Sequence, residues 1–429
     1  MTPTILVLIL GFAVLLTGAG LLGTLLGVRA TLASFSNIET GMIMAGYYAG
    51  YILGTRLTPR IIRNVGHIRT FAALAALVTA ACLAYGLVVA PLPWLALRLL
   101  NGACVVGLYM VVESWLNAQC TGRERGRVFA IYMMSTLGAL GAGQFLLPLA
   151  DTAGLTLFAV AAILIAIGLV PVVVTRVTEP RIEIDTPVHL IELLRISPLG
   201  ALGTLCAGIV GGAFWGMTAV FGGRLELAER DIAMLISATI LGGAILQWPI
   251  GHLSDRYDRR MVLILTSLAV AIVAAVTAFI VMKDLPGLVV SAFIYGGLMF
   301  SLYSLSVAHT NDHLEREQVL EATRGLLLIY GLGALSGPLL VGIAMDALGP
   351  VGLPLVSTLG ATLLALYGFY RTTRRAPPPT DEQSEFVPMV RTTPVALEMY
   401  PQADADAVGH EPGITDEPES GIAGRRPEQ

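Results

Sequence analysis

Residues 251–260 read GHLSDRYDRR, and the charges in this stretch separate two long runs that contain no charged residue. The run before them covers residues 232–254, and the run after them covers residues 261–282. A helix needs about 20 predominantly apolar residues to cross the roughly 30 Å hydrocarbon core of a membrane. Each run therefore has the length of one membrane span, and the charged residues form a short loop at one membrane surface.

The same alternation of uncharged runs and short charged loops continues along the chain. The run 70–97 contains Pro91 and Pro93, which end one helix and open the next. Ile38–Leu57 and Trp94–Asn117 are two more spans, although they are short or carry a charge. The other uncharged runs are 1–28, 70–97, 128–150, 152–175, 196–223, 285–311, 325–345 and 347–370. Together these segments predict twelve transmembrane helices.

Composition supports a membrane protein and argues against several soluble classes. Of 429 residues, 55% are hydrophobic and 13% are charged, and the mean hydropathy is +0.76. Ordinary globular proteins carry roughly 25% charged residues. A nucleic-acid-binding protein, a secreted disulfide scaffold and a cytosolic enzyme are therefore disfavoured. The four cysteines show no metal-type or redox spacing, so we expect small buried hydrophobes, no metal and no cofactor.

The distribution of charge predicts the orientation of the chain. With the N-terminus inside, the inner loops and proximal tail hold 18 basic residues and the outer loops hold four. Because basic residues concentrate in cytoplasmic loops, we expect both termini in the cytoplasm and the protein in the inner (plasma) membrane. From Ala376 onward the chain has 11 acidic and three basic residues and few aromatics, so we expect a disordered acidic tail.

The chain divides into two halves around its longest internal loop, Arg176–Ser197, which follows the sixth span. Gly138–Leu140 near the fifth span matches Gly333–Leu335 near the eleventh, as an internal repeat requires. The predicted units are a six-helix bundle at 1–176, a cytoplasmic linker at 177–197, a second six-helix bundle at 198–372 and the tail at 373–429.

Several motifs resemble those of the major facilitator superfamily. The loop signature is a glycine, an Asp-Arg pair and a basic pair, although Asp258 stands where the family has a second glycine. Arg98-Leu-Leu-Asn-Gly102 resembles the family's Arg-x-x-x-Gly motif. At finer grain, VVES at Val111–Ser114 and QWPIG at Gln247–Gly251 look like the YcaD-type transporters. The residues of the loop signature are Gly251, Asp255, Arg256, Arg259 and Arg260.

This resemblance covers roughly residues 5–372 and implies a fold and a function. The implied fold is an all-α membrane protein with twelve helices in two pseudo-symmetric six-helix bundles. The implied function is secondary transport of a small molecule by alternating access, with protons favoured over sodium and export over import. We expect a monomer in the lipid bilayer that does not bind nucleic acid.

The loop signature predicts a gate at the cytoplasmic surface. The carboxylate of Asp255 can accept hydrogen bonds at a helix N-terminus in the other half, near Gly126, because the helix dipole there favours an anion. The alternative interpretation is an ordinary basic cytoplasmic loop.

Two charged residues within the fourth span are candidates for coupling. Arg98 can bind an anionic group or tune a carboxylate, and the alternative role is an interfacial anchor. Glu113 can take up a proton near neutral pH because burial disfavours the charged form of a carboxyl group; the alternative is an interfacial acid paired with nearby arginines. The two are 15 residues and roughly 22 Å apart along the helix, so they cannot pair directly.

Other polar and aromatic residues are placed by the sequence to line a central cavity, although such residues also pack between helices or face lipid. The series Gly46, Gly50 and Gly54 is assigned a structural role, the close approach of another helix. The cavity candidates are Gln144, Gln247, Trp215, Tyr109, Tyr295 and Tyr303.

The function predicted from the sequence is thus secondary transport, and the chain is not expected to be an enzyme. No GxxxxGK[ST] signature is present, which argues against ATP-driven transport. Three alternatives are a proton-independent facilitator, a receptor or scaffold that acts through its tail, and an intramembrane enzyme. For the enzyme, the cluster His309, Asp312 and His313 supplies too few groups.

Overall fold

The computed structural model describes residues 2–120, 124–175, 190–281, 284–314, 316–374, 383, 386–387 and 393. These residues form twelve α-helices of 18 to 33 residues, one short α-helix and three segments of 3-10 or π-helix, and none of them lies in a strand. The first half contains α1 (Pro3–Leu32), α2 (Asn37–Val65), α3 (His67–Leu87), α4 (Pro91–Gln119), α5 (Glu124–Gln144) and α6 (Thr156–Val174). The second half contains α7 (Leu190–Ile196), α8 (Pro198–Arg224), α9 (Glu229–Arg256), α10 (Arg259–Val276), α11 (Leu285–Asn311), α12 (Arg316–Leu348) and α13 (Gly352–Thr372).

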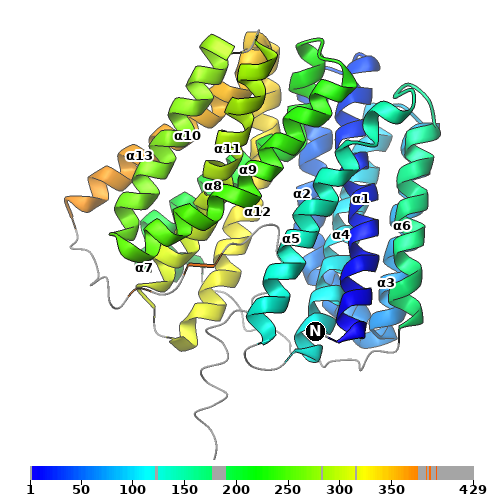
Figure 1. Cartoon of the computed structure of the whole chain (residues 1–429), viewed down its shortest axis with the longest axis horizontal. Coiled ribbons are helices and arrows are strands. Elements are labelled where there is room, and N and C mark those ends of the chain that lie inside the picture. The colour runs from blue at the N-terminus through cyan, green and yellow to red at the C-terminus, as the bar shows by residue number, and fades with distance from the viewer. Residues whose placement is uncertain are drawn as a thin grey trace, which may run out of the picture.

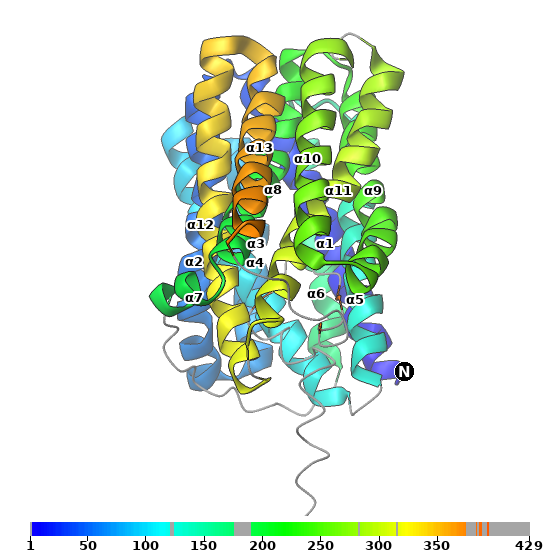
Figure 2. The same ribbon diagram turned by 90° about the vertical axis from the view of Figure 1, so that its left-hand side faces the viewer.

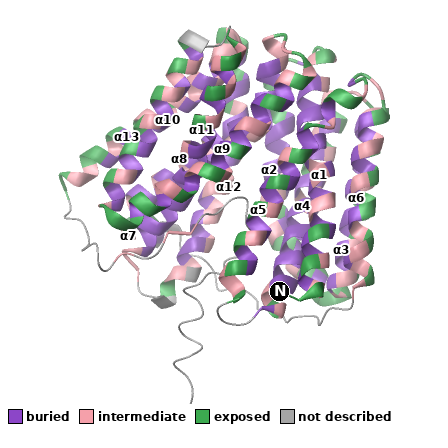
Figure 3. Ribbon diagram, viewed as in Figure 1, coloured by how far each residue is buried: buried purple, intermediate pink, exposed green. Residues whose placement is uncertain are grey.

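The helices have the length and composition of membrane spans. Ten segments among the described residues are long and apolar enough to cross a membrane, and they include every long helix except α2. The α2 helix is more polar, with Glu39 at its start and Arg56, Arg60 and Arg63 toward its end. Many large apolar side chains are exposed on the outer faces of the bundles, where lipid would cover them (Figure 3). The chain is an integral membrane protein.

The long helices form two bundles, α1–α6 and α8–α13, that lie side by side (Figure 1). The second bundle faces the viewer in Figure 2. Equivalent helices make equivalent contacts in both bundles: α2 packs on α4 as α9 packs on α11, and α1 packs on α5 as α8 packs on α12. The predicted all-α fold with two pseudo-symmetric six-helix bundles is confirmed.

Glycines let the equivalent helix pairs approach closely. A Cβ atom added at Gly102 of α4 would lie 1.9 Å from the backbone oxygen of Tyr47 in α2. In the second bundle, a Cβ atom at Gly296 of α11 would lie 1.9 Å from the backbone oxygen of Thr239 in α9. The predicted close approach at Gly46, Gly50 and Gly54 is confirmed, because all three contact α4. Helix contact in this fold therefore depends on positions without a side chain.

The segments outside the bundles are described only in part. The predicted linker 177–197 contains the seven-residue helix α7, and its residues before Leu190 lie outside the described range. In the predicted tail 373–429, the described residues after Arg374 are Gln383, Phe386, Val387 and Thr393. The predicted disorder of the tail therefore remains a prediction.

Candidate functional site

The two bundles meet at the end of the molecule that the sequence predicts to be external. Arg224 at the end of α8 donates hydrogen bonds to Asn37 Oδ1 at 2.9 Å and to the backbone oxygen of Phe35 at 2.7 Å. The carboxylate of Asp346 on α12 accepts from the backbone N–H of Asn37 at 3.0 Å and of Ile38 at 3.2 Å. An acid thus binds the N-terminus of α2, where the helix dipole favours an anion. This contact closes the predicted external end.

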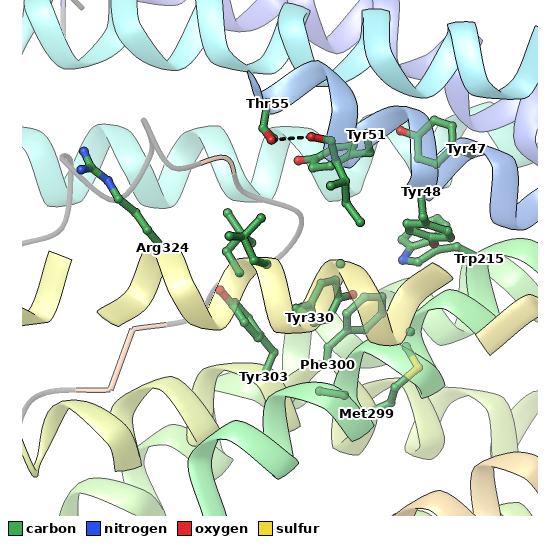
Figure 4. A pocket seen from close by; sticks show the side chains of 16 residues that line it. Tyr47, Tyr48, Tyr51, Thr55, Trp215, Met299, Phe300, Tyr303, Arg324 and Tyr330 are labelled. Atoms are coloured by element: carbon green, nitrogen blue, oxygen red, sulfur yellow. Dashed lines mark hydrogen bonds between the residues drawn. The ribbon is translucent and has the colours of Figure 1, made fainter. Parts of the chain in front are cut away.

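Toward the opposite end, where the N-terminus lies, the bundles diverge (Figure 1) and a cavity opens between them. The cavity has a volume of about 950 Å³, counting the part that is open to solvent. Its walls come from α2, α8, α11 and α12, and aromatic side chains dominate them (Figure 4). The polar and aromatic residues of this central cavity are Tyr47, Tyr48, Tyr51, Thr55, Trp215, Phe300, Tyr303, Arg324 and Tyr330.

A second, more polar cavity adjoins the first, since Tyr47, Tyr48 and Trp215 line both. It extends into the first bundle, between α1, α4 and α5. Besides Tyr47 and Tyr48, its polar residues from that bundle are Thr24, Arg98, Asn101, Tyr109 and Gln144. The two adjoining cavities thus give the candidate site an aromatic part and a polar part.

Arg98 is the charged residue of the polar cavity. Its side chain is buried, with 7% exposed, so it is not an anchor at the membrane surface. Its guanidinium lies 3.0 Å from the sulfur of Met44 and 5.3 Å from the centroid of the Tyr47 ring. Within the described part of the chain, its Nε has no hydrogen-bond partner and no carboxylate forms an ion pair with it. Burial of a charge without a counter-ion is costly, so this arginine has capacity for an anion.

Glu113 lies fully buried on the same helix, near its other end. Its Oε1 accepts a hydrogen bond from the hydroxyl of Tyr132 on α5 at 3.0 Å. Its Oε2 accepts a hydrogen bond from the hydroxyl of Thr393, a tail residue that is itself fully buried. The carboxyl group is therefore shielded from water in this conformation, at the predicted cytoplasmic end.

The loop signature forms a network inside the second bundle. The guanidinium of Arg259, which is 1% exposed, donates to Asp312 Oδ1 at 2.6 Å and to Asp255 Oδ1 at 3.1 Å. It also donates to the hydroxyl of Ser254 at 2.9 Å and thus joins α9, α10 and α11. Arg260 is buried against Asp258. Arg256 of the signature is exposed.

The predicted contact between Asp255 and the first bundle is not formed in this conformation. In the described residues, Asp255 binds Arg259 and accepts a hydrogen bond from the backbone N–H of Phe386 at 2.9 Å. The ring of Phe386 covers Gly251. The bundles are apart at this end, so the clasp near Gly126 remains a prediction for a conformation in which they meet.

The structure brings four of the six predicted cavity residues together. Gln144, Trp215, Tyr109 and Tyr303 line the two cavities. Tyr295 lies inside the second bundle, where its hydroxyl binds that of Ser357 at 2.8 Å. The sixth residue is Gln247, which is buried in α9 and lines neither cavity.

Most of the polar and aromatic cavity residues are not predicted from the sequence, and five of them show why. In α2, the stretch YYAGY supplies three tyrosines, but its sequence predicts only the close helix contact at its glycine. The Arg-x-x-x-Gly motif predicts no role for Asn101, which precedes its glycine, and Arg324 reads from the sequence only as one of the basic loop residues. These residues are Tyr47, Tyr48, Tyr51, Asn101 and Arg324.

Comparison with known proteins agrees with this arrangement. Residues 200–400 match the family model for the Major Facilitator Superfamily. The uncharacterized MFS-type transporter YcaD of Escherichia coli K12 is 28% identical over 351 residues, which cover 80% of this chain and 90% of that protein. The YcaD protein of Escherichia fergusonii is 27% identical over 347 residues, with the same coverage of both chains.

Solved structures share the fold at low sequence identity. The nucleoside transporter NupG has a TM-score of 0.71 at 14% identity, covering 87% of this chain and all of that chain. A bacterial homolog of the human lysosomal transporter Spinster, in an inward-facing and unoccupied conformation, has a TM-score of 0.69 at 15% identity, covering 90% and 99%.

The two-bundle fold of this chain is thus shared with two solved transporters. The chain is similar to transporters of the major facilitator superfamily, and its motifs resemble those of the YcaD-type transporters.

Proposed function

We propose that this transporter is coupled to protons, binds a small molecule in the two adjoining cavities and moves it by alternating access. The observation that carries the proposal is Glu113, a fully buried carboxyl group that accepts a hydrogen bond from Tyr132. It lies on the helix that also carries Arg98 into the polar cavity. Protonation of Glu113 and binding of a substrate at Arg98 would therefore both affect the position of the same helix, α4.

Alternating access is supported by the unequal ends of the molecule. The contact of Asp346 with the start of α2 holds one end closed. At the other end, Asp255 accepts a hydrogen bond from the backbone N–H of Phe386 in this conformation. In a conformation closed at that end, its carboxylate would instead bind a helix N-terminus. We propose that transport exchanges the first contact for the second. All walls of the cavities come from one chain, which supports a monomer as the working unit.

The proposed orientation places both termini in the cytoplasm of a cell bounded by the inner membrane. It is supported by the 18 basic residues on that side against four on the other. We expect a membrane-impermeant maleimide to label Arg230→Cys in intact cells. Labelling of this position only after cell lysis would show that the orientation is the opposite one.

The coupling is tested by proton movement in liposomes that contain the purified protein and an enclosed pH-sensitive dye. A panel of small molecules is added outside without an imposed gradient. We expect at least one compound to change the internal pH at a rate that depends on the protein, because its movement carries protons. The direction of transport, for which the resemblance favours export, follows from repeating the assay with sided vesicles.

Two alternatives predict different results. A proton-independent facilitator would move a radiolabelled compound without changing the internal pH. A receptor or scaffold that acts through its tail would move no compound, and its cellular phenotype would disappear on truncation after Arg375.

A further inference from the structure

We propose that the substrate is a small organic anion, a carboxylate with an aromatic or apolar body. The inference rests on the proposed function, because it assigns the occupant of the same two cavities. The anionic group would bind Arg98 and Asn101, and the body would lie against Tyr47, Tyr48 and Trp215.

As a first step, the charge of the residues that line the cavities indicates that the substrate is an anion. Among the described residues that line them are two arginines, Arg98 and Arg324, and no aspartate or glutamate. A site with this lining is positive and favours an anion over a neutral molecule or a cation.

The polar contacts of the cavity carry the second step. Arg98 is more than nine-tenths buried, and its Nε has no hydrogen-bond partner among the described residues. Asn101, one turn further along α4 and 3% exposed, has an Nδ2 group that likewise lacks a described partner. Buried donors are ordinarily satisfied, and a carboxylate, which only accepts, can satisfy both.

As a third step, the aromatic residues indicate that the rest of the substrate, apart from its anionic group, is aromatic or apolar. Tyr47, Tyr48 and Trp215 line both cavities and so lie where the polar part meets the aromatic part. Flat aromatic walls favour rings and apolar chains over a strongly hydrated body such as a sugar.

The test is ligand binding to the full-length protein in detergent, which needs no transport and no proton gradient. The melting temperature is measured with three matched pairs: phenylacetate and phenylacetamide, benzoate and benzamide, indole-3-acetate and indole-3-acetamide. Tryptamine is the cationic partner of the last pair. We expect at least one acid to stabilise the protein and to bind at least tenfold more tightly than its amide, and tryptamine to have no effect.

Variants then assign the binding to the polar cavity. Arg98→Gln and Asn101→Ala should each weaken binding of the acid at least tenfold, and Arg98→Lys should be intermediate because it keeps the charge and loses the planar fork. Without ligand, Arg98→Gln should melt no lower than the wild type, because it removes a buried charge that has no counter-ion. Arg230→Gln, an exposed arginine outside the cavities, is the matched control and should bind normally.

The proposal is wrong if no acid in the panel binds, if an amide binds as well as its acid, or if Arg98→Gln and Asn101→Ala bind like the wild type. Binding without proton movement would overturn the proposed coupling instead, so the two failures are distinguishable.

A separate observation, the contacts of the tail, carries a second proposal. Thr393 binds Glu113 in the first bundle, and Phe386 binds Asp255 and covers Gly251 in the second. These tail residues therefore contact both bundles at the end where the bundles are apart.

We infer that Phe386 and Thr393 inhibit transport within their own molecule, through their contacts with Asp255 and Glu113 at the predicted cytoplasmic end. Closure of this end requires Asp255 to reach the first bundle, and the backbone of Phe386 holds that carboxylate in the meantime. Protonation of Glu113 from the cytoplasm requires access to the carboxyl group that Thr393 covers. The tail must therefore leave before the transport cycle can proceed.

Maleimide labelling of Thr393→Cys in the full-length protein tests the docking. The four native cysteines are buried, and the wild type gives the background rate. We expect Thr393→Cys to react at least tenfold more slowly than glutathione, and Phe386→Ala in the same chain to restore a fast reaction. A rate equal to that of glutathione would show that the tail does not dock.

Truncation after Arg375 tests the inhibition. Protein-dependent proton movement should rise severalfold in the truncated protein, while its melting temperature stays that of the full chain. Slow labelling of Thr393→Cys together with unchanged proton movement on truncation would establish a docked tail that does not inhibit.

Discussion

Glu113→Gln is expected to abolish proton-driven accumulation of the substrate while preserving exchange of substrate down its own gradient. Glutamine has the shape of the protonated acid and keeps an acceptor for the hydroxyl of Tyr132. The cavities can therefore still alternate, but no proton cycle drives them. The measurement compares uptake into liposomes with and without an imposed pH gradient, using the compound that moves most protons in the wild type.

The matched control for this substitution is Glu226→Gln, which neutralises an exposed glutamate in the loop between α8 and α9. It should accumulate substrate like the wild type. If Glu113→Gln also accumulates substrate normally, Glu113 is not the coupling group, and the proton-independent facilitator becomes the better account of the protein.

Gly102→Ala is expected to lower the stability of the first bundle substantially. The added Cβ atom would lie 1.9 Å from the backbone oxygen of Tyr47, far inside van der Waals contact, so α2 and α4 must move apart. Overpacking of this kind typically costs about 1–3 kcal/mol and sometimes more. Because a backbone atom is the obstacle, no side-chain rotation can relieve the clash.

Gly138→Ala is the control, since a Cβ atom at this position of α5 has no heavy atom within 4 Å. Both variants make the same chemical change within a long helix, and alanine is the better helix former. The melting temperature of Gly102→Ala should fall well below that of the wild type, and that of Gly138→Ala should stay equal or rise. Equal melting temperatures for the two variants would contradict the close contact of α2 and α4.

The fold could be predicted from the sequence because membrane spans are local features. Uncharged runs of suitable length separate charged loops, and even the polar helix α2 was found from Ile38–Leu57. The division into two six-helix bundles follows from the internal repeat and the resemblance, because a single uncharged run does not show which helices belong together. The short helix α7 is not predicted from the sequence. Its seven residues lie within the predicted linker 177–197, which the sequence distinguishes only by its charges and prolines.

The site was predicted only in part, because a cavity depends on which face of each helix looks inward. Charged residues inside spans are conspicuous, so the sequence singles out Arg98, which lines the polar cavity, and Glu113, which is buried but lines neither cavity. A tyrosine or an asparagine in a span gives no such signal: Tyr295 and Tyr303 are alike in sequence, yet one binds Ser357 inside a bundle and the other lines the central cavity. The contact between Thr393 and Glu113 spans 280 positions and has no local pattern at all.

Because Phe386 and Thr393 belong to the same chain as the residues they contact, inhibition would not depend on the concentration of the protein. Phe386 lies 14 positions after the end of α13, so the docking residues are never far from the opening of their own molecule. Short tethers raise the local concentration of a binding segment to the millimolar range. A tail with only millimolar intrinsic affinity would therefore dock in a large share of molecules, and dilution of the protein would not release it. A free peptide with the same sequence would need millimolar concentrations to restore inhibition of the truncated transporter. A cytoplasmic partner with micromolar affinity for the undocked tail could activate transport at roughly micromolar levels, by withdrawing the tail as it binds.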